Sequence, residues 1–177
     1  MNNDLVVLVD DADQPLGHEE KIEAHRQGLL HRAFSVFLFD QRGQLLLQRR
    51  TKTKYHSGGL WSNTCCSHPR PGEEPLEAAR RRLGEEMGIL CPLTKAFDFV
   101  YRAQVGEDLI EHEFDHVFIG HYEGAVQPDP DEVMDYKWLS AGAVRDQLNR
   151  FPQQYTPWFA LAWDKAAASN RDSLSTR

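Results

Sequence analysis

The sequence of 177 residues has little of several features that define other classes of protein. It contains three cysteines, two of them adjacent, and so small and odd a number argues against a disulfide framework. No apolar run approaches the length needed to span a bilayer, which argues against a membrane protein. Basic residues do not prevail: 20 lysines and arginines stand against 27 acidic residues. The resulting net charge of −7 argues against nucleic-acid binding through a basic surface.

The sequence also lacks internal repeats and low-complexity linkers. Residues 1–4, Met-Asn-Asn-Asp, have no basic start of the kind that opens a secretory signal, so a cytoplasmic protein is expected. A hydrophobic fraction of 41% can build an ordinary core, and the length suits one domain. We expect this domain over residues 1–168, followed by a disordered tail over residues 169–177, in a monomer or weak homodimer.

Short apolar stretches between turn residues predict a sheet with helices. Strands are expected over residues 5–9, 33–40, 44–49, 96–105, 114–122 and 133–139. The second and third should form a hairpin, and Pro15 and Gly17 should mark turns. Helices are expected over residues 19–27, 74–87 and 141–149 and from Pro157 onward, with Ser140 and Thr156 as caps. Because strands and helices interleave without strict alternation, an α/β (α+β) fold with a mixed sheet flanked by helices is predicted.

Residues 61–69, Trp-Ser-Asn-Thr-Cys-Cys-Ser-His-Pro, hold the most reactive side chains of the sequence. Turn formers flank this segment, so it is expected to be a short strand that runs into a loop. Residues two apart on a strand share a face, so Cys66 and His68 point the same way and Cys65 points the other way. A free cysteine is more commonly a small buried hydrophobe, but a thiol beside an imidazole and a basic loop can be activated.

Four histidines stand in informative settings, namely His25, His31, His68 and His112. Any one of them alone is more commonly a surface residue or a hydrogen-bonded structural residue. Glu111 and Glu113 lie two apart at the start of a predicted strand and therefore face one side. Three imidazoles and these two carboxylates would make a five- or six-coordinate site. Such a site suits Mn²⁺ or Mg²⁺, with Zn²⁺ as an alternative.

A third pattern covers residues 67–89. The Nudix signature, G-x5-E-x7-R-E-U-x-E-E-x-G-U, aligns its charged positions with Glu73, Arg81, Glu85 and Glu86. Two positions depart from it, because Ser67 replaces the opening glycine and Arg82 replaces the glutamate after the arginine. An arginine there removes a metal ligand and adds a cation that can bind a diphosphate. The chain thus resembles the Nudix fold but not a working Nudix hydrolase; an amphipathic helix with a solvated charged face is the alternative.

With these patterns together, the sequence resembles the type I isopentenyl-diphosphate isomerases. The segments that carry the resemblance are residues 28–39, 61–69, 101–103, 111–113, 131–133 and 157–158. Among them the run Asn-Thr-Cys-Cys-Ser-His-Pro is highly specific, and the likeness extends over about residues 5–165. The resemblance implies a Nudix-like fold and the interconversion of isopentenyl and dimethylallyl diphosphate. It implies a small diphosphate substrate and neither a nucleic acid nor a membrane as partner.

The resemblance also implies a role for each matching residue. The metal ligands map to His25, His31, His68, Glu111 and Glu113, for Mn²⁺ or Mg²⁺ and sometimes Zn²⁺. A second Mg²⁺, which bridges the substrate diphosphate to a helix glutamate, maps to Glu86. The catalytic residues map to Cys66, Glu113 and Tyr101. The diphosphate contacts map to Arg50, Lys54 and Arg82, and the aromatic residue over the hydrocarbon maps to Trp158.

This chemistry explains why such residues are needed. Protonating an unactivated double bond gives a tertiary carbocation, so a strong local acid and a second group acting as base are required. Glu113, hydrogen-bonded to Tyr101, and Cys66 would share this work, in an order that the sequence leaves open. Trp158 would stabilise the cation and exclude water. We further expect the segment through His31 to close as a lid, because metal ligation would order it.

Two other functions remain open at this stage. One is a Nudix-type diphosphate hydrolase, against which Arg82 and Ser67 speak. The other is a non-enzymatic module that binds a metal or senses a nucleotide.

Overall fold

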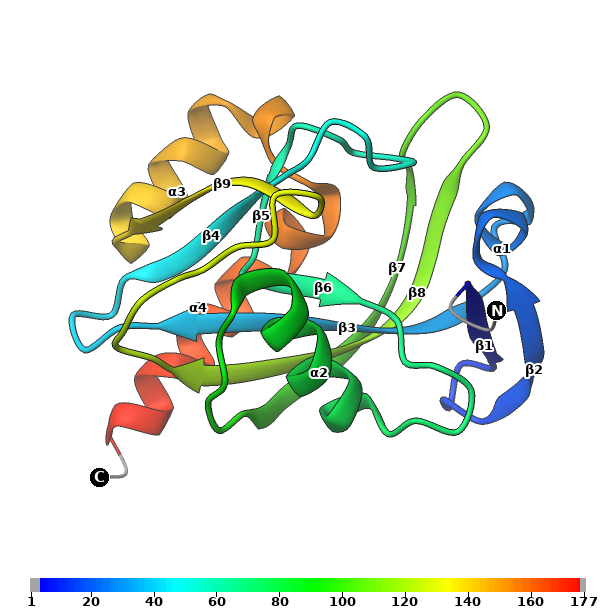
Figure 1. Ribbon diagram of the computed structural model, residues 1–177, viewed down its shortest axis with the longest axis horizontal. Coiled ribbons are helices and arrows are strands. Elements are labelled where there is room, and N and C mark those ends of the chain that lie inside the picture. The colour runs from blue at the N-terminus through cyan, green and yellow to red at the C-terminus, as the bar shows by residue number, and fades with distance from the viewer. Residues whose placement is uncertain (1–3, 176–177) are drawn as a thin grey trace.

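A computed structural model describes residues 4–175, which form a mixed sheet with helices on both faces (Figure 1). The strands are β1 (Leu5–Val9), β2 (Pro15–Glu20), β3 (His31–Phe39), β4 (Leu45–Arg50), β5 (Trp61–Ser62), β6 (Cys65–Ser67), β7 (Thr94–Gln104), β8 (Ile110–His121) and β9 (Val133–Leu139). The helices are α1 (Lys21–Gln27), α2 (Pro75–Met87), α3 (Ala141–Arg150), the 3₁₀ turn η1 (Pro152–Gln154) and α4 (Pro157–Ser175). The predicted class is confirmed, and every predicted strand and helix has a counterpart.

Strand β3 is the centre of the sheet. It runs parallel to β8 and antiparallel to β1, β4 and β6. The hairpin predicted with β4 is closed by the pair Phe39 and Leu45, after which β4 leaves β3 and pairs with β9 instead. β6 occupies the edge of β3 that this divergence leaves open. The short segment with the cysteines therefore lies inside the sheet.

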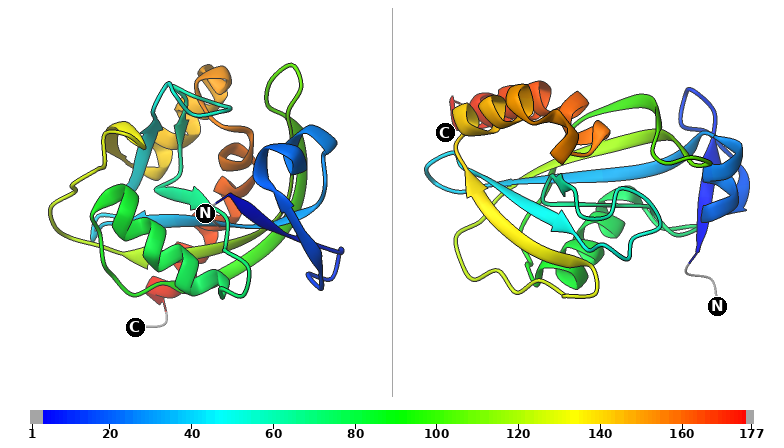
Figure 2. Two further views of the ribbon diagram at one scale, coloured as in Figure 1. Left: turned by 45° about the vertical axis from the view of Figure 1, so that its right-hand side comes forward. Right: turned by 90° about the horizontal axis from the view of Figure 1, so that it is seen from above.

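Both faces of β3 are covered, which explains its continuous apolar run. Phe34, Val36 and Leu38 pack in a cluster with α2, whereas Phe37 and Phe39 pack in a second cluster with α4. Alternate residues of a strand point to opposite faces, so one strand serves two cores. Figure 2 shows α2 and α4 on opposite sides of the sheet.

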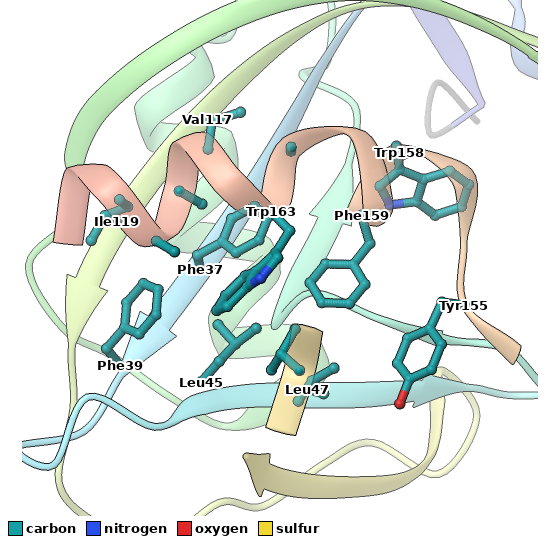
Figure 3. Close-up of a cluster of buried hydrophobic side chains, with 14 of the residues drawn as sticks. Phe37, Phe39, Leu45, Leu47, Val117, Ile119, Tyr155, Trp158, Phe159 and Trp163 are labelled. Carbon is teal, nitrogen blue, oxygen red and sulfur yellow. The ribbon is translucent and has the colours of Figure 1, made fainter. Parts of the chain in front are cut away.

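The core under α4 is aromatic. The ring of Phe159 lies 6.0 Å from that of Phe37, and the ring of Trp163 lies 6.4 Å from that of Phe39 (Figure 3). Ring separations in this range are favourable for aromatic pairs. Because Trp158 in the first turn of the same helix belongs to this cluster, the core fixes the start of α4 where it borders the sheet.

The N-terminal hairpin differs from the prediction. Pro15 and Gly17 were expected to mark turns, but both lie in β2, which pairs with β1. The turn comes earlier: the side chain of Asp10 accepts hydrogen bonds from the backbone of Ala12 and Gln14, and Asp13 adopts a left-handed conformation with φ of 61°. Proline is tolerated as the first residue of a strand, so its presence did not exclude pairing.

The C-terminal segment also differs from the prediction. Residues 169–177 were expected to be disordered, but α4 continues through Ser175, and residues 176–177 lie outside the described range. Asn170 is buried and its side chain lies 2.8 Å from His121 Nε2, which fastens the last turns of the helix to β8. Among the described helices, none combines the length and the apolar character needed to cross a membrane.

Candidate active site

The strand register gathers side chains from distant parts of the chain around one cavity. His31 at the start of β3 lies beside Glu113 in the parallel pair, and Glu113 lies opposite Tyr101 in the antiparallel pair with β7. On the other edge of β3, Ser35 pairs with Cys66 of β6. These strands border a cavity of about 360 Å³, which also reaches the basic loop between β4 and β5. Small-molecule sites have this size.

The predicted metal ligands converge at one end of this cavity. Four of them have donor atoms within 4.8 Å of one another, namely His25, His31, His68 and Glu113. The Nε2 atoms of His68 and His31 lie 2.9 and 3.5 Å from Glu113 Oε1. Glu111 joins the group through Oε1, which lies 3.1 Å from His25 Nε2. The structure therefore brings all five residues together, from α1, β3, β8 and the segment after β6.

Two of the imidazoles are held in the tautomer that a metal ligand needs. His25 Nδ1 lies 2.6 Å from the carbonyl oxygen of Lys21, and His31 Nδ1 lies 2.8 Å from that of Leu29. A carbonyl oxygen only accepts, so each Nδ1 carries the proton and each Nε2 presents a lone pair. His31 Nε2 is buried without a hydrogen-bond partner, which is costly unless something binds it. This donor set fits a divalent metal ion.

Burial sets the charge of this cluster. It lowers the pKa of His31 to about 4 and that of His68 well below its ordinary value, so both rings are neutral near pH 7. Burial also raises the pKa of Glu113, and the charge of Glu111 raises it further. Burial opposes ionisation of Glu111 too, but hydrogen bonds from Glu113 and two histidines outweigh it and hold its pKa well below the usual range. A proton on this pair is therefore favoured on Glu113 over Glu111.

Tyr101 connects the two carboxylates. Its hydroxyl donates to Glu113 Oε2 at 2.7 Å and lies 3.3 Å from Glu111 Oε2. Burial, together with the two carboxylates, raises the pKa of Tyr101 well above its usual value, so the phenol keeps its proton. This places a neutral carboxylic acid and a phenol next to each other on the cavity wall, which is an arrangement suited to proton donation.

The two adjacent cysteines have different surroundings, as predicted for alternating strand positions. Cys65 is fully buried in the α2 core, where its thiol donates to Glu86 at 3.4 Å. Cys66 borders the cavity, and Arg50 Nη1 lies 3.8 Å from its sulfur. Burial raises the pKa of the Cys66 thiol to about 11, while the charge of Arg50 opposes this rise. Cys66 is therefore the thiol that can meet a ligand in the cavity.

The far end of the cavity is basic. Arg50, Lys54 and Arg82 all border it. Lys54 forms an ion pair with Glu132, and Arg82 lies 3.4 Å from the same carboxylate. Trp158 stands between this end and the metal cluster. Its indole lies 5.3 Å from the Arg50 guanidinium and donates to Asn63 of the cysteine segment at 3.2 Å. Cations, an aromatic wall and the acid–base groups thus face one space.

Glu86, the predicted ligand of a second Mg²⁺, already has three donors. Arg82 Nη2 donates to its Oε1 at 2.6 Å, and Gln48 donates to its Oε2 at 2.9 Å, beside the contact from Cys65. No cluster of metal-ligating groups within residues 4–175 includes Glu86. The second metal site stays a prediction, and it requires that Arg82 turn away from Glu86.

The structure also separates residues that the sequence grouped. His112 lies between the two glutamates of β8, so it points to the opposite face and its Nδ1 lies 2.9 Å from the carbonyl oxygen of Gly28. The cavity residues that the sequence reasoning missed include Lys21, Tyr55 and His56. His56 lies in an irregular loop, where no periodicity shows which way a side chain points. The lid over the site stays a prediction, although His25 of α1 is fully buried.

Comparisons with known proteins show the family of this chain. A profile of the NUDIX domain matches residues 29–159. An isopentenyl-diphosphate Delta-isomerase of Aromatoleum aromaticum is 54% identical over 162 residues, which are 92% of this chain and 86% of that protein. The isopentenyl-diphosphate Delta-isomerase of Pectobacterium atrosepticum is 54% identical over 158 residues, 89% of this chain and 88% of that protein.

Solved structures share the fold at lower identity. A Deinococcus radiodurans protein has a TM-score of 0.77 at 18% identity, covering 92% of this chain and 98% of that chain. A MutT protein of Methanosarcina mazei has a TM-score of 0.64 at 19% identity, covering 81% of this chain and 95% of that chain.

Proposed function

The chain belongs to the NUDIX domain family and, within it, to the isopentenyl-diphosphate Delta-isomerases, and we propose that its cavity interconverts isopentenyl diphosphate and dimethylallyl diphosphate. One observation supports this most directly. A carboxyl group hydrogen-bonded to a phenol borders the same cavity as a thiol, and cations also line this cavity. An isomerase needs two proton-transfer groups and a hold on the diphosphate.

The reaction moves a proton on and another off. Glu113, assisted by Tyr101, gives its proton to the terminal methylene of isopentenyl diphosphate. A C–H bond forms and the O–H electron pair stays on the carboxylate. Cys66 then removes a proton from the carbon nearer the diphosphate, and that C–H pair becomes the new double bond. Cys66 must act as a thiolate, a form that burial disfavours and the charge of Arg50 favours. In the reverse direction Cys66 donates the proton and Glu113 removes one. Glu113 and Cys66 therefore hold one transferable proton between them at each stage.

The carbocation between the two steps needs protection. Trp158 presents an aromatic face to the cavity and is buried, so water does not reach this wall. A dry aromatic face stabilises a nearby cation by about 0.5–2 kcal/mol. Excluding water also prevents capture of the cation as an alcohol.

The imidazoles and carboxylates of the cluster would hold a divalent metal through His25, His31, His68, Glu111 and Glu113. When bound, the ion would supply positive charge that stabilises the ionised carboxylates. Mn²⁺, Mg²⁺ or Zn²⁺ is proposed here. The two oxygens of Glu113 face different groups: Oε1 faces the imidazoles, and Oε2 accepts a hydrogen bond from Tyr101.

Arg50, Lys54 and Arg82 are proposed to bind the diphosphate, with a second Mg²⁺ at Glu86. Guanidinium groups match phosphate geometry in two-point contacts. The present partners of Lys54 and Arg82 are carboxylates, which a diphosphate would replace. The cytoplasmic location and the monomer or weak homodimer also remain predictions.

The reaction in deuterated water tests this proposal against hydrolysis. Isopentenyl diphosphate incubated with the protein and Mn²⁺ or Mg²⁺ should give deuterated dimethylallyl diphosphate without release of phosphate. Phosphate release without isomerisation would favour a hydrolase. Binding of metal or nucleotide without any turnover would favour a non-enzymatic module.

The proposed lid has its own test. Hydrogen exchange of residues 1–30 should slow when metal and a substrate analogue are added, because His25 and His31 would fasten this segment. Unchanged exchange would remove the lid from the mechanism.

A further inference from the structure

His56 lies in the loop between β4 and β5 and reaches the metal cluster beside His25 and Glu111. Its side chain is 2% exposed. Its Nε2 lies 2.5 Å from Oε1 of Glu111, which is one of the five proposed ligands. This nitrogen is therefore buried at the cluster, against a carboxylate that would itself hold the ion.

The other ring nitrogen of His56 is held by an oxygen. Nδ1 lies 3.1 Å from the hydroxyl oxygen of Ser57, which can accept a hydrogen bond from a protonated Nδ1. The ring then presents its Nε2 lone pair to the cluster, as His25 and His31 do with Nδ1 bonded to backbone oxygens. The partner of the non-ligating nitrogen selects the tautomer of a metal-bound histidine. A carbonyl oxygen fixes that tautomer for His25 and His31, and the Ser57 hydroxyl is compatible with it for His56.

The donor atoms of His56 also form part of a second group. His25, His56 and Glu111 have donor atoms within 4.8 Å of one another, and this group shares His25 with the group of His31, His68 and Glu113. The two groups are thus joined through His25, and the second contains two of the five proposed ligands, His25 and Glu111.

We propose that His56 is a further ligand of the metal centre, which gives that centre four imidazole nitrogens and two carboxylates. This inference rests on the metal site of the proposed function and adds a residue to it. Imidazole suits Zn²⁺ and other transition ions better than Mg²⁺, which prefers oxygen. The fourth imidazole should therefore bias the centre toward Mn²⁺, Co²⁺ or Zn²⁺ and against Mg²⁺.

A purely structural role for His56 would tolerate substitutions that metal ligation would not. The backbone carbonyl of His56 accepts from Arg50 Nη2 at 3.3 Å, a contact that any residue at this position keeps. A role limited to hydrogen bonding Glu111 would be kept by glutamine, whose amide is a donor of similar reach. Only ligation through a ring nitrogen requires histidine.

The experiment titrates the full-length, metal-stripped protein with Co²⁺ and Mn²⁺. Wild type, His56→Ala and His56→Gln are compared, with His18→Ala on the exposed surface of β2 as the matched control. Metal affinity is measured by calorimetry, the Co²⁺ site by visible absorption, and the imidazoles bound to Mn²⁺ are counted by pulsed EPR. Circular dichroism verifies that each variant is folded.

The expected result is weaker Mn²⁺ and Co²⁺ binding, by at least about tenfold, in both His56 variants and one imidazole fewer in their EPR spectra. His18→Ala should match wild type. Wild-type affinity in His56→Ala, rescue by His56→Gln, or a count of three imidazoles in the wild type would each overturn the ligand assignment. Absence of metal binding by the wild type would instead overturn the metal centre of the proposed function.

Discussion

Two groups of carboxylates lie in this molecule, one along α2 and one on β8, and they have opposite kinds of partner. On α2, Arg81 donates to Glu73 at 2.7 and 2.9 Å, and Arg82 donates to Glu85 and Glu86 at 2.8 and 2.6 Å. On β8, the glutamates face imidazoles that burial keeps neutral. Guanidinium groups cancel the charge of α2, whereas neutral rings leave the charge of β8 for a metal ion.

The difference in the partners of these carboxylates distinguishes this chain from the Nudix signature. In the Nudix signature the residue after the arginine is a glutamate, but here it is Arg82, whose guanidinium occupies the carboxylates of α2. Within residues 4–175, the groups of candidate metal ligands include the glutamates of β8 and no residue of α2. At this position α2 presents the guanidinium of Arg82 to the cavity in place of the carboxylate of the signature.

Removing the acid or the base should have the largest effect. Glu113→Gln and Cys66→Ala should each lower turnover by about 10²–10⁴-fold or more, because each removes a proton-transfer group. Turnover is measured with isopentenyl diphosphate at saturating metal, and circular dichroism verifies the fold. Cys66→Ser should be less active than Cys65→Ser, since only Cys66 borders the cavity. The reverse order would mean that the other thiol reacts.

Removing an imidazole of the β8 cluster should show which of the two groups of carboxylates takes part in metal binding. His68→Ala should lose metal from the purified protein and weaken Mn²⁺ affinity by at least about tenfold, because a proposed ligand is gone. Metal analysis and calorimetry measure this. Arg81→Ala, which frees carboxylates of α2 rather than β8, is the matched control. If it lowered metal content as much as His68→Ala, the distinction between the two groups would fail.

Removing the guanidinium of Arg82 should affect binding more than chemistry. Arg82→Ala should raise KM for isopentenyl diphosphate by about 10–100-fold with a smaller change in kcat, since a charge-assisted hydrogen bond contributes about 1.5–3 kcal/mol. Arg80→Ala changes a neighbouring exposed arginine that pairs with Glu77 and should leave KM unchanged. An unchanged KM in Arg82→Ala would leave this cation with a structural role on α2 alone.

The smallest effect concerns stability. Glu73→Gln should lower the free energy of unfolding by about 1 kcal/mol, because it removes one charge from a partly exposed two-point pair with Arg81. The hydrogen bond from Arg81 holds the pKa of Glu73 below its usual range, so this stabilisation is present at neutral pH and is lost as the pH falls through that lowered pKa. Urea unfolding of both proteins should therefore converge in acid. A constant difference at all pH values would contradict the electrostatic origin.

Much of the fold could be predicted because its signals are local. The apolar run of β3 and the amphipathic pattern of α2 identify themselves within a few residues. The strand status of Pro15 could not be read locally, because pairing with β1 decides it. The helical C-terminus depends on Asn170, a polar residue whose burial follows from a contact with His121 on a distant strand.

The site divides in the same way. That Cys66 faces the cavity and Cys65 the core follows from strand alternation, and the two glutamates share a face for the same reason. Convergence of these strands with His25 and His31 depends on a parallel pairing that no local pattern specifies. His56 was missed because its loop has no period from which a direction can be inferred.

The parallel pair of β3 and β8 has a consequence for folding. His31 and Glu113 come from the first and second halves of the chain, so closing the loop between them costs entropy before any contact repays it. Pairings of this kind form slowly. A metal held by residues on both strands would bind only the folded chain and would cross-link this seam. The ion would then raise the barrier to unfolding as well as the equilibrium stability. The centre proposed for proton transfer would thereby also determine how long the molecule lasts.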